Sequence, residues 1–137
     1  MKYIAHSLED TKKIAVSFAE KLNLGDVVLL NGDLGAGKTT FTQFVFRALG
    51  VKEVVSSPTF AILKSYIGKF TLHHFDTYRI TIDEAIEAGF DETLGDRNSV
   101  IFIEWSENVL PLLPNKKIIV NIKKIDENTR EFEIINE

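Results

Sequence analysis

The chain contains no cysteine among its 137 residues. Disulfides, thiolate zinc sites and cysteine nucleophiles are therefore excluded, which is consistent with a reducing compartment. No apolar run approaches ~20 residues, so we expect no transmembrane helix. Residues 1–7 lack the apolar core of a secretory signal, and Glu9 and Asp10 soon follow them. We therefore expect a cytoplasmic protein that has no membrane among its partners.

An excess of positive charge is also missing. The 16 Lys and Arg residues are outnumbered by 20 Asp and Glu residues, so the formal net charge is −4. This balance argues against broad, nonspecific nucleic-acid binding by the chain alone, and we expect no DNA partner. Contact of a local basic patch with RNA inside a complex stays open. The length and the hydrophobic fraction of 45 % suit one globular domain, predicted to span residues 1–137.

One stretch, from Gly32 to Thr39, fits the pattern G-x-x-x-x-G-K-[ST] at every fixed position. Glycines let the backbone turn tightly, so that consecutive N–H groups point at phosphate oxygens. Lys38 supplies a positive charge for the outer phosphates, and the Thr39 hydroxyl can ligate Mg²⁺. The residues expected to bind a nucleotide here are Leu34, Gly35, Ala36, Gly37, Lys38, Thr39 and Thr40.

The flanks of this stretch predict a strand before the loop and a helix after it. Residues 26–30 form an apolar run typical of a buried strand. In residues 39–49 apolar side chains recur at helical spacing, and Gly50 is expected to end the helix. A helix that begins there adds a partial positive charge facing the phosphates. The alternative is a glycine-rich turn between strand and helix that binds no ligand.

The rest of the chain predicts an α/β fold. Ser7 begins a capping box, and the apolar spacing after it predicts a helix over 8–22. The other expected elements are an edge strand at 2–6, a partly strand-like 51–55, a β-hairpin from 60–66 and 70–75, a helix at 81–88, a loop at 90–98, a strand at 99–105, a short helical piece at 107–113, and a terminal hairpin from 118–122 and 130–135. We therefore predict a single P-loop NTPase-like domain, with a central mixed sheet flanked by helices, a β-hairpin insertion and a C-terminal hairpin.

Two carboxylates stand where predicted strands end. Glu104 ends an apolar strand in the manner of a Walker B acid, at the sheet edge where open α/β sheets place their ligands. It is expected to ligate Mg²⁺, directly or through water, or to position the attacking water. Asp76 is a second candidate for Mg²⁺. Lys38, Asp76 and Glu104 are the predicted catalytic residues, and Thr39 and Glu104 the predicted metal ligands.

Several neighbouring residues keep two interpretations. His74 lies two residues before Asp76 and either orients it or is a plain surface histidine. Thr59 either faces the γ-phosphate or belongs to an ordinary connection rich in Ser and Thr. Thr11 either contacts the nucleotide base or lies on a helix that only covers the sheet. Trp105 is either a core residue or packs against the nucleotide.

The nucleotide is expected to be ATP. Guanine specificity in many P-loop GTPases rests on an N-K-x-D element, and the nearest string, Asn115-Lys116-Lys117-Ile118, lacks the aspartate. A small-molecule kinase needs an acceptor pocket and usually a lid, for which 137 residues leave little room. Mg²⁺-ATP is thus the expected cofactor, and a free-standing kinase is the less favoured reading.

Four motifs together resemble the TsaE (YjeE) family of small bacterial P-loop ATPases. They are the phosphate loop continued to Phe41, Ser57-Pro58-Thr59-Phe60, His74-Phe75-Asp76-Thr77-Tyr78-Arg79 and Ile103-Glu104-Trp105-Ser106-Glu107. They follow in the family's order, in a chain of the family's length, and cover nearly the whole sequence. The C-terminal hairpin is poorly diagnostic.

The resemblance implies a role in forming threonylcarbamoyladenosine next to the anticodon of tRNA, together with TsaB and TsaD. TsaD-like and TsaB-like proteins would be the partners, and tRNA would be reached indirectly through their complex. The chain would bind and hydrolyse ATP, slowly when alone. The resemblance also implies that the nucleotide site takes in Trp105, Ser106 and Glu107, with Thr11 and Arg130 at its periphery.

Two hypotheses from different classes follow. In the first, ATP hydrolysis is needed for turnover of the tRNA-modifying complex. In the second, the chain is a nucleotide-gated binding module, in which ATP occupancy orders a docking surface and hydrolysis is incidental. They share one binding site and differ in the use of Glu104 and Asp76.

Overall fold

The computed structural model describes residues 1–33, 35–55, 63–78 and 80–137. Two predicted site residues, Leu34 and Thr59, lie outside these ranges, as does the stretch 57–60. The strands of the described chain are β1 (Lys2–Ala5), β2 (Val27–Asn31), β3 (Leu63–Ile67), β4 (Thr71–Asp76), β5 (Ser99–Glu104), β6 (Ile118–Lys124) and β7 (Arg130–Asn136). They form one sheet in the order β1-β7-β6-β2-β5-β4-β3.

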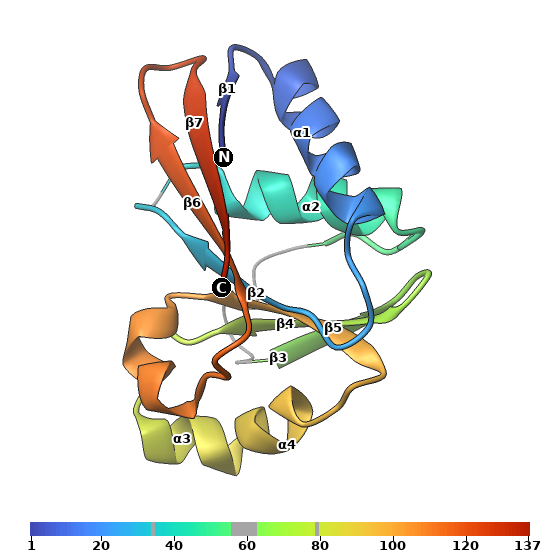
Figure 1. Ribbon diagram of the computed structural model, residues 1–137, viewed down its shortest axis with the longest axis vertical. Helices are drawn as coiled ribbons and strands as arrows, with labels where there is room; N and C mark the ends of the chain where they lie inside the picture. The colour runs from blue at the N-terminus through green and yellow to red at the C-terminus, as the bar shows by residue number, and fades with distance from the viewer. Residues whose placement is uncertain (34, 56–62, 79) are drawn as a thin grey trace.

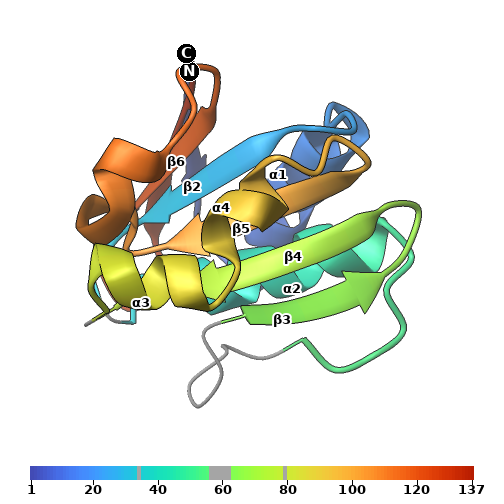
Figure 2. The ribbon, with the colours of Figure 1, turned by 90° about the horizontal axis from the view of Figure 1, so that it is seen from below.

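Helices cover both faces of this sheet. The α-helices are α1 (Leu8–Glu20), α2 (Lys38–Ala48), α3 (Ile82–Glu87) and α4 (Phe90–Leu94), and a 3₁₀ helix, η1, spans Ser106–Leu112. Figure 1 shows α1 and α2 together on one side of the sheet, with α3 and α4 on the other. Figure 2 shows β2, β5, β4 and β3 side by side, with α2 behind them and α4 in front. The predicted α/β class, with a central sheet flanked by helices, is confirmed.

The sheet is mixed, as expected. Strands β6, β2, β5 and β4 are parallel to their neighbours in the middle, while β3 pairs antiparallel with β4 and the pairs β6–β7 and β1–β7 are antiparallel. Both predicted hairpins are therefore present. Because β2, β5 and β4 run in one direction, their carboxyl ends meet at one edge, with Leu30 opposite Glu104 and Glu104 opposite Asp76.

The core is divided between the two faces by the period of two along each strand. Val28 and Leu30 of β2 face α1 and α2, whereas Val27 and Leu29 face α3, α4 and η1. Such strands are apolar throughout because both of their faces are buried. This explains why the runs at 26–30 and 99–103 were recognisable in the sequence.

The predicted helix ends were close to the observed ones. The Ser7 hydroxyl accepts a hydrogen bond from the Asp10 backbone N–H at 3.2 Å and caps α1, as the sequence indicated. After α2, Gly50 has φ of +89°, and the Val51 N–H bonds to the Phe46 carbonyl at 3.0 Å. That is the geometry in which glycine ends a helix.

Two expectations about local structure were wrong. Residues 90–98, expected to be a loop, begin with the helix α4. Phe90 is fully buried and its ring lies 4.8 Å from that of Phe75, so a tertiary contact stabilises this short helix. Residues 51–55, expected to be partly strand-like, form no strand in the described chain. The Gln43 side chain donates to the Val55 carbonyl at 2.7 Å, where a sheet partner would otherwise donate.

Within the described residues, no helix combines the length and the apolar character needed to cross a membrane.

Candidate functional site

The phosphate loop leaves β2 at the carboxyl edge of the sheet and enters α2. Gly37 has φ of +108°, a conformation that L side chains rarely adopt. At Gly32, an added Cβ would stand 2.6 Å from the Ile122 carbonyl oxygen, too close for any other residue. The glycines of the motif thus serve a tight turn, as the sequence predicted, and Gly32 also serves a close backbone approach that the sequence did not predict.

The N-terminus of α2 is open, unlike those of two other helices. Hydroxyls of Ser7 and Thr81 cap α1 and α3. Among the described residues, α2 has no side-chain cap, because its N-cap is Gly37. The first N–H groups of an uncapped helix carry a partial positive charge and favour an anion.

Lys38 is buried at this helix start, with 5 % of its surface exposed. Its ammonium donates to the Gly32 carbonyl at 2.7 Å and lies 3.5 Å from the centre of the Trp105 ring. Burial lowers the pKa of Lys38, and the charges of Glu104 and Asp76 oppose that shift. The lysine is therefore a partly desolvated cation held by a carbonyl and a ring, both of which a phosphate can replace.

Asp76 and Glu104 end the neighbouring parallel strands β4 and β5, directly opposite each other. Burial raises the pKa of Asp76, and the nearby Glu104 charge raises it further, while a backbone hydrogen bond from Tyr78 at 3.0 Å acts in the opposite direction. Two carboxylates crowded beside one lysine form a site that an added cation would relieve.

Glu104 is itself held by His74. The Nε2 atom of His74 lies 2.7 Å from Oε2 of Glu104, and both side chains are buried. The sequence offered His74 as a partner of Asp76 or as a surface residue. The surface interpretation was wrong, because the side chain is buried. His74 lowers the pKa of nearby Asp76 against the effect of burial, but its hydrogen bond goes to Glu104. In parallel strands, His74 is opposite Phe102, so it shares a face with Glu104, two residues further on.

The turn after β5 is strained at Trp105, the one non-glycine residue of the described chain with a positive φ, of 61°. The Thr77 hydroxyl donates to the Glu104 and Trp105 carbonyls at 2.8 and 2.6 Å and holds this backbone. The Tyr78 and Trp105 rings lie 4.9 Å apart. Strain of this kind persists only where the surroundings enforce it, and it is common at ligand sites.

A small pocket of about 110 Å³ adjoins the loop on its other side. Four predicted nucleotide-binding residues from distant parts of the chain line this pocket: Thr11, Gly37, Thr40 and Arg130. Arg130 donates through Nε to the Ala36 carbonyl at 3.1 Å and through one terminal nitrogen to carbonyls of the β6–β7 turn. Its contacts indicate a residue that holds the phosphate loop in place.

The remaining predicted residues surround the same edge. Trp105 and Glu107 line a hollow of about 200 Å³ together with Gly32 and Asp33. Ser106 is buried, and its hydroxyl lies 3.5 Å from Oδ1 of Asn31, at the end of β2. We call the group formed by Lys38, His74, Asp76, Glu104 and Trp105 the carboxyl-edge site.

The donors at this site fit Mg²⁺. Thr39, Asp76 and Glu104 offer oxygen ligands, which Mg²⁺ prefers. In the part of the chain that the structure describes, no three His, Asp or Glu side chains are grouped so that they could hold a metal unaided. Mg²⁺ commonly takes one or two carboxylates and completes its shell with phosphates and water. The donor set therefore suits a cation that arrives with a nucleotide.

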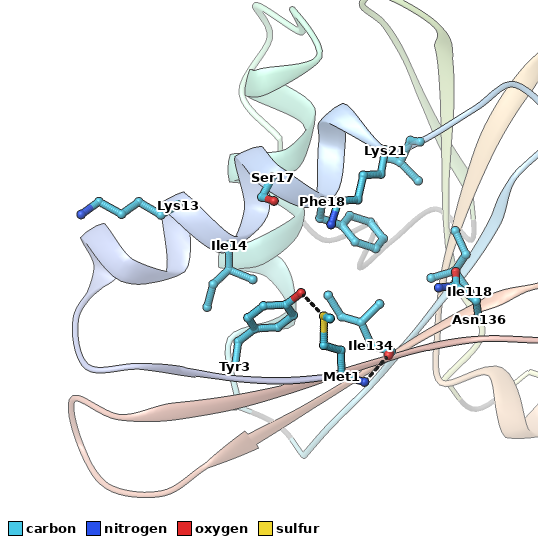
Figure 3. Close-up of a pocket in the computed structure, with 11 residues that line it drawn as sticks. Met1, Tyr3, Lys13, Ile14, Ser17, Phe18, Lys21, Ile118, Ile134 and Asn136 are labelled. Atoms are coloured by element: carbon cyan, nitrogen blue, oxygen red, sulfur yellow. Dashed lines mark hydrogen bonds between the residues drawn. The ribbon is translucent and has the colours of Figure 1, made fainter.

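A larger apolar hollow, of about 340 Å³, lies between α1 and the strands β1, β6 and β7 (Figure 3). We call it the α1 hollow. Ile14 and Phe18 line it from the helix, and Tyr3 and Ile134 line it from the sheet. Among its described lining residues, none belongs to the predicted nucleotide site. This apolar hollow and the cluster of reactive groups are therefore separate features.

Three comparisons agree on the relatives of this chain. Residues 5–132 match the family model described as threonylcarbamoyl adenosine biosynthesis protein TsaE. The tRNA threonylcarbamoyladenosine biosynthesis protein TsaE of Rickettsia felis is 44 % identical over 135 residues, covering 96 % of this chain and 78 % of that protein. The Bacillus subtilis protein of the same name is 39 % identical, covering 96 % and 83 %. The crystal structure of Bacillus subtilis YdiB superimposes with a TM-score of 0.82 at 35 % identity, covering 96 % of this chain and 82 % of that chain.

Proposed function

The chain belongs to the TsaE family of threonylcarbamoyl adenosine biosynthesis proteins, and we propose that it is the Mg²⁺-dependent ATP-binding and ATP-hydrolysing subunit required to form threonylcarbamoyladenosine in tRNA. It acts in the cytoplasm with TsaB-like and TsaD-like partners and reaches tRNA through their complex. In this role it supports or regulates turnover of the complex.

One observation carries the proposal: a buried lysine and two carboxylates from neighbouring strands meet at an uncapped helix N-terminus. Phosphoryl transfer depends mainly on positioning and on neutralising charge. An open helix start and Lys38 supply positive charge for the phosphates, and Asp76 and Glu104 supply negative charge for their cation. An acyl-transfer or redox site would need different groups.

Each residue has a distinct part. Backbone N–H groups at the start of α2 bind phosphate oxygens, and Lys38 leaves the Gly32 carbonyl and the Trp105 ring to contact the outer phosphates. Thr39 and Glu104 would hold Mg²⁺, which would neutralise phosphate charge. Asp76 lies beside Glu104, where it can orient the attacking water.

The base and ribose belong to the smaller pocket on the other side of the loop. Thr11 and Thr40 offer hydroxyls there, and Arg130 braces the loop from the β6–β7 turn. Ser106 and Glu107 border the phosphate end. A pocket of about 110 Å³ is too small to enclose a nucleotide, so we expect one face of the nucleotide to be left for a partner.

The test is ATP hydrolysis by the purified chain, alone and with TsaB and TsaD, with Lys38→Ala as the control. Stimulation by the partners that disappears in the Lys38 variant supports a partner-dependent ATPase. Tight ATP binding without hydrolysis in either setting contradicts it and favours the second candidate.

That second candidate is the nucleotide-gated module, and the contact between Lys38 and Trp105 favours it. Moving the lysine onto a phosphate removes its contact with the ring, in a turn already strained. ATP occupancy would thereby change the surface after β5 without hydrolysis. A Glu104→Ala variant that supports full multiple-turnover modification would establish this candidate and refute the first.

A further inference from the structure

We propose that His74 is a positioning residue for Glu104. Its imidazole holds one carboxylate oxygen and leaves the other for the cation, so that Glu104 acts as a one-oxygen ligand and the site favours Mg²⁺ over Ca²⁺. The inference rests on the proposed function, and it assigns to His74 a specificity role within it.

The contact between His74 and Glu104 is short and buried. Nε2 of His74 lies 2.7 Å from Oε2 of Glu104, and the two side chains are 0 % and 4 % exposed. When Glu104 acts as an ionised ligand its carboxylate can only accept, so in that state the hydrogen of this bond stands on Nε2. Among the described residues, no other hydrogen bond reaches the Glu104 carboxylate, so none of these residues competes with a cation for Oε1.

In the described part of the chain, the second ring nitrogen of His74 makes no competing hydrogen bond. Its Nδ1 is buried and has no hydrogen-bond partner among the described residues. A histidine that served only to satisfy the core would be expected to bond through both nitrogens. Among the described residues, the carboxylate of Glu104 is the one polar group to which His74 is hydrogen-bonded.

Packing fixes the direction of this bond. The Phe46 ring of α2 stands edge-on to His74 at 6.1 Å, and Phe46 also contacts Phe102, the residue opposite His74 on β5. The Thr77 hydroxyl fixes the backbone carbonyl of Glu104 at 2.8 Å. With the backbone and one oxygen held, the carboxylate must give up its bond to His74 to present both oxygens freely to an ion.

This restraint favours Mg²⁺ over Ca²⁺ because the two cations coordinate carboxylates differently. Mg²⁺ requires near-octahedral geometry and accepts single carboxylate oxygens. Ca²⁺ takes six to eight ligands and readily uses a carboxylate through both oxygens. Holding Oε2 on His74 therefore disfavours Ca²⁺ and leaves the Mg²⁺ arrangement intact.

The experiment measures ATP affinity by calorimetry in Mg²⁺, in Ca²⁺ and in EDTA, for wild type, His74→Phe and His74→Gln. His73→Phe is the matched control, because His73 is the next residue on β4 and bonds instead to the Ser65 hydroxyl at 2.8 Å. We expect His74→Phe to weaken binding in Mg²⁺ by about 10-fold or more, with no change in EDTA and a smaller preference for Mg²⁺ over Ca²⁺. His74→Gln, whose amide can donate to Glu104, should restore most of the preference, and His73→Phe should keep all of it.

An unaltered ratio of Mg²⁺ to Ca²⁺ affinity in folded His74→Phe would overturn the inference alone. If that variant does not fold, His74→Gln is compared with His74→Asn, which is one methylene shorter and cannot reach the carboxylate. Equal ratios in the Gln and Asn variants would also overturn it. Failure of the wild type to bind ATP in Mg²⁺ would instead refute the proposed function, and this inference with it.

Discussion

The carboxyl-edge site and the α1 hollow differ in their volume and in the polar groups that they contain. The hollow is larger, at about 340 Å³, and mostly apolar. The hollow beside Trp105 in the site is smaller, at about 200 Å³, yet the site contains a buried lysine and a histidine and carboxylate that are hydrogen-bonded to each other. A ligand site is recognised by fixed polar groups that converge, and volume alone does not identify it.

The two regions also contribute differently to the stability of the fold. Residues around the α1 hollow stabilise the fold by burying apolar surface. At the site, desolvation lowers the pKa of Lys38 and raises that of Asp76, so each charge is held in an unfavourable setting. Substitutions in the two regions should therefore change different quantities.

The largest expected effect is on stability, from Phe18→Ala in the wall of the hollow. Phe18 is 7 % exposed, and its ring lies 5.5 Å from Phe41 and 6.4 Å from Phe102. Removing it should lower the free energy of unfolding by about 3–5 kcal/mol in denaturant titration. ATP affinity of the folded variant should change by no more than about twofold. An affinity loss as large as the stability loss would show that the two regions are coupled.

The converse substitution is Glu104→Gln in the site. It keeps the shape and an oxygen for His74 but removes the charge that serves Mg²⁺. We expect ATP turnover with the partner proteins to fall by about 100-fold or more, with ATP affinity in EDTA preserved. Glu87→Gln, at an exposed acid of α3 outside the site, is the control and should keep most of the turnover. Equal losses in the two variants would mean that general negative charge, and not Glu104, matters.

Asp76→Asn tests the cost of holding charge in the site. Because its pKa is raised in the folded protein, Asp76 favours folding when protonated, and this contribution is lost as pH rises through the raised pKa. The Asn variant without nucleotide should therefore unfold at a higher temperature than wild type at pH 7, by on the order of 1–2 °C. The gain should shrink on acidification. Thermal scans between pH 4 and pH 8 measure it, and a gain independent of pH would contradict the electrostatic explanation.

The smallest effect should come from filling the hollow with Ser17→Leu. Ser17 lines it from α1, and leucine adds apolar volume and favours the helix. The free energy of unfolding should rise by roughly 0.5–1 kcal/mol, with ATP affinity unchanged. Denaturant titration and calorimetry check the two statements. A drop in affinity would reveal a link through α1, whose Thr11 lines the pocket beside the phosphate loop.

Several local elements of the fold could be predicted from the sequence. The loop from Gly32 to Thr39, its flanking strand and helix, and the acid at the end of β5 depend on neighbouring residues and on strand periodicity. Helix α4 was missed because its stability comes from Phe90 packing on Phe75, a contact that a composition rich in polar residues does not reveal. The prediction that residues 51–55 are partly strand-like was wrong for a related reason. Val51 and Val55 are buried without being in a strand.

The candidate site could be predicted only in part from the sequence. Lys38 was predicted from the glycine-rich pattern, and Asp76 and Glu104 were predicted because each ends a strand; the structure brings these strand ends to one sheet edge. The bond from Arg130 to the Ala36 carbonyl joins residues 94 positions apart, and no spacing rule predicts it. The pairing of His74 with Glu104 required knowing that β4 and β5 are adjacent and in which register.

By itself, then, the sequence determined a phosphate loop, two strand-end acids and an α/β fold, because these follow from backbone conformations within short segments. The tertiary structure decided which groups meet: the lysine against the tryptophan, the histidine against the glutamate, and a large apolar hollow away from both. The reason is that strand order and register are set by the whole sheet, and a side chain's partner across two strands is not encoded by either strand alone.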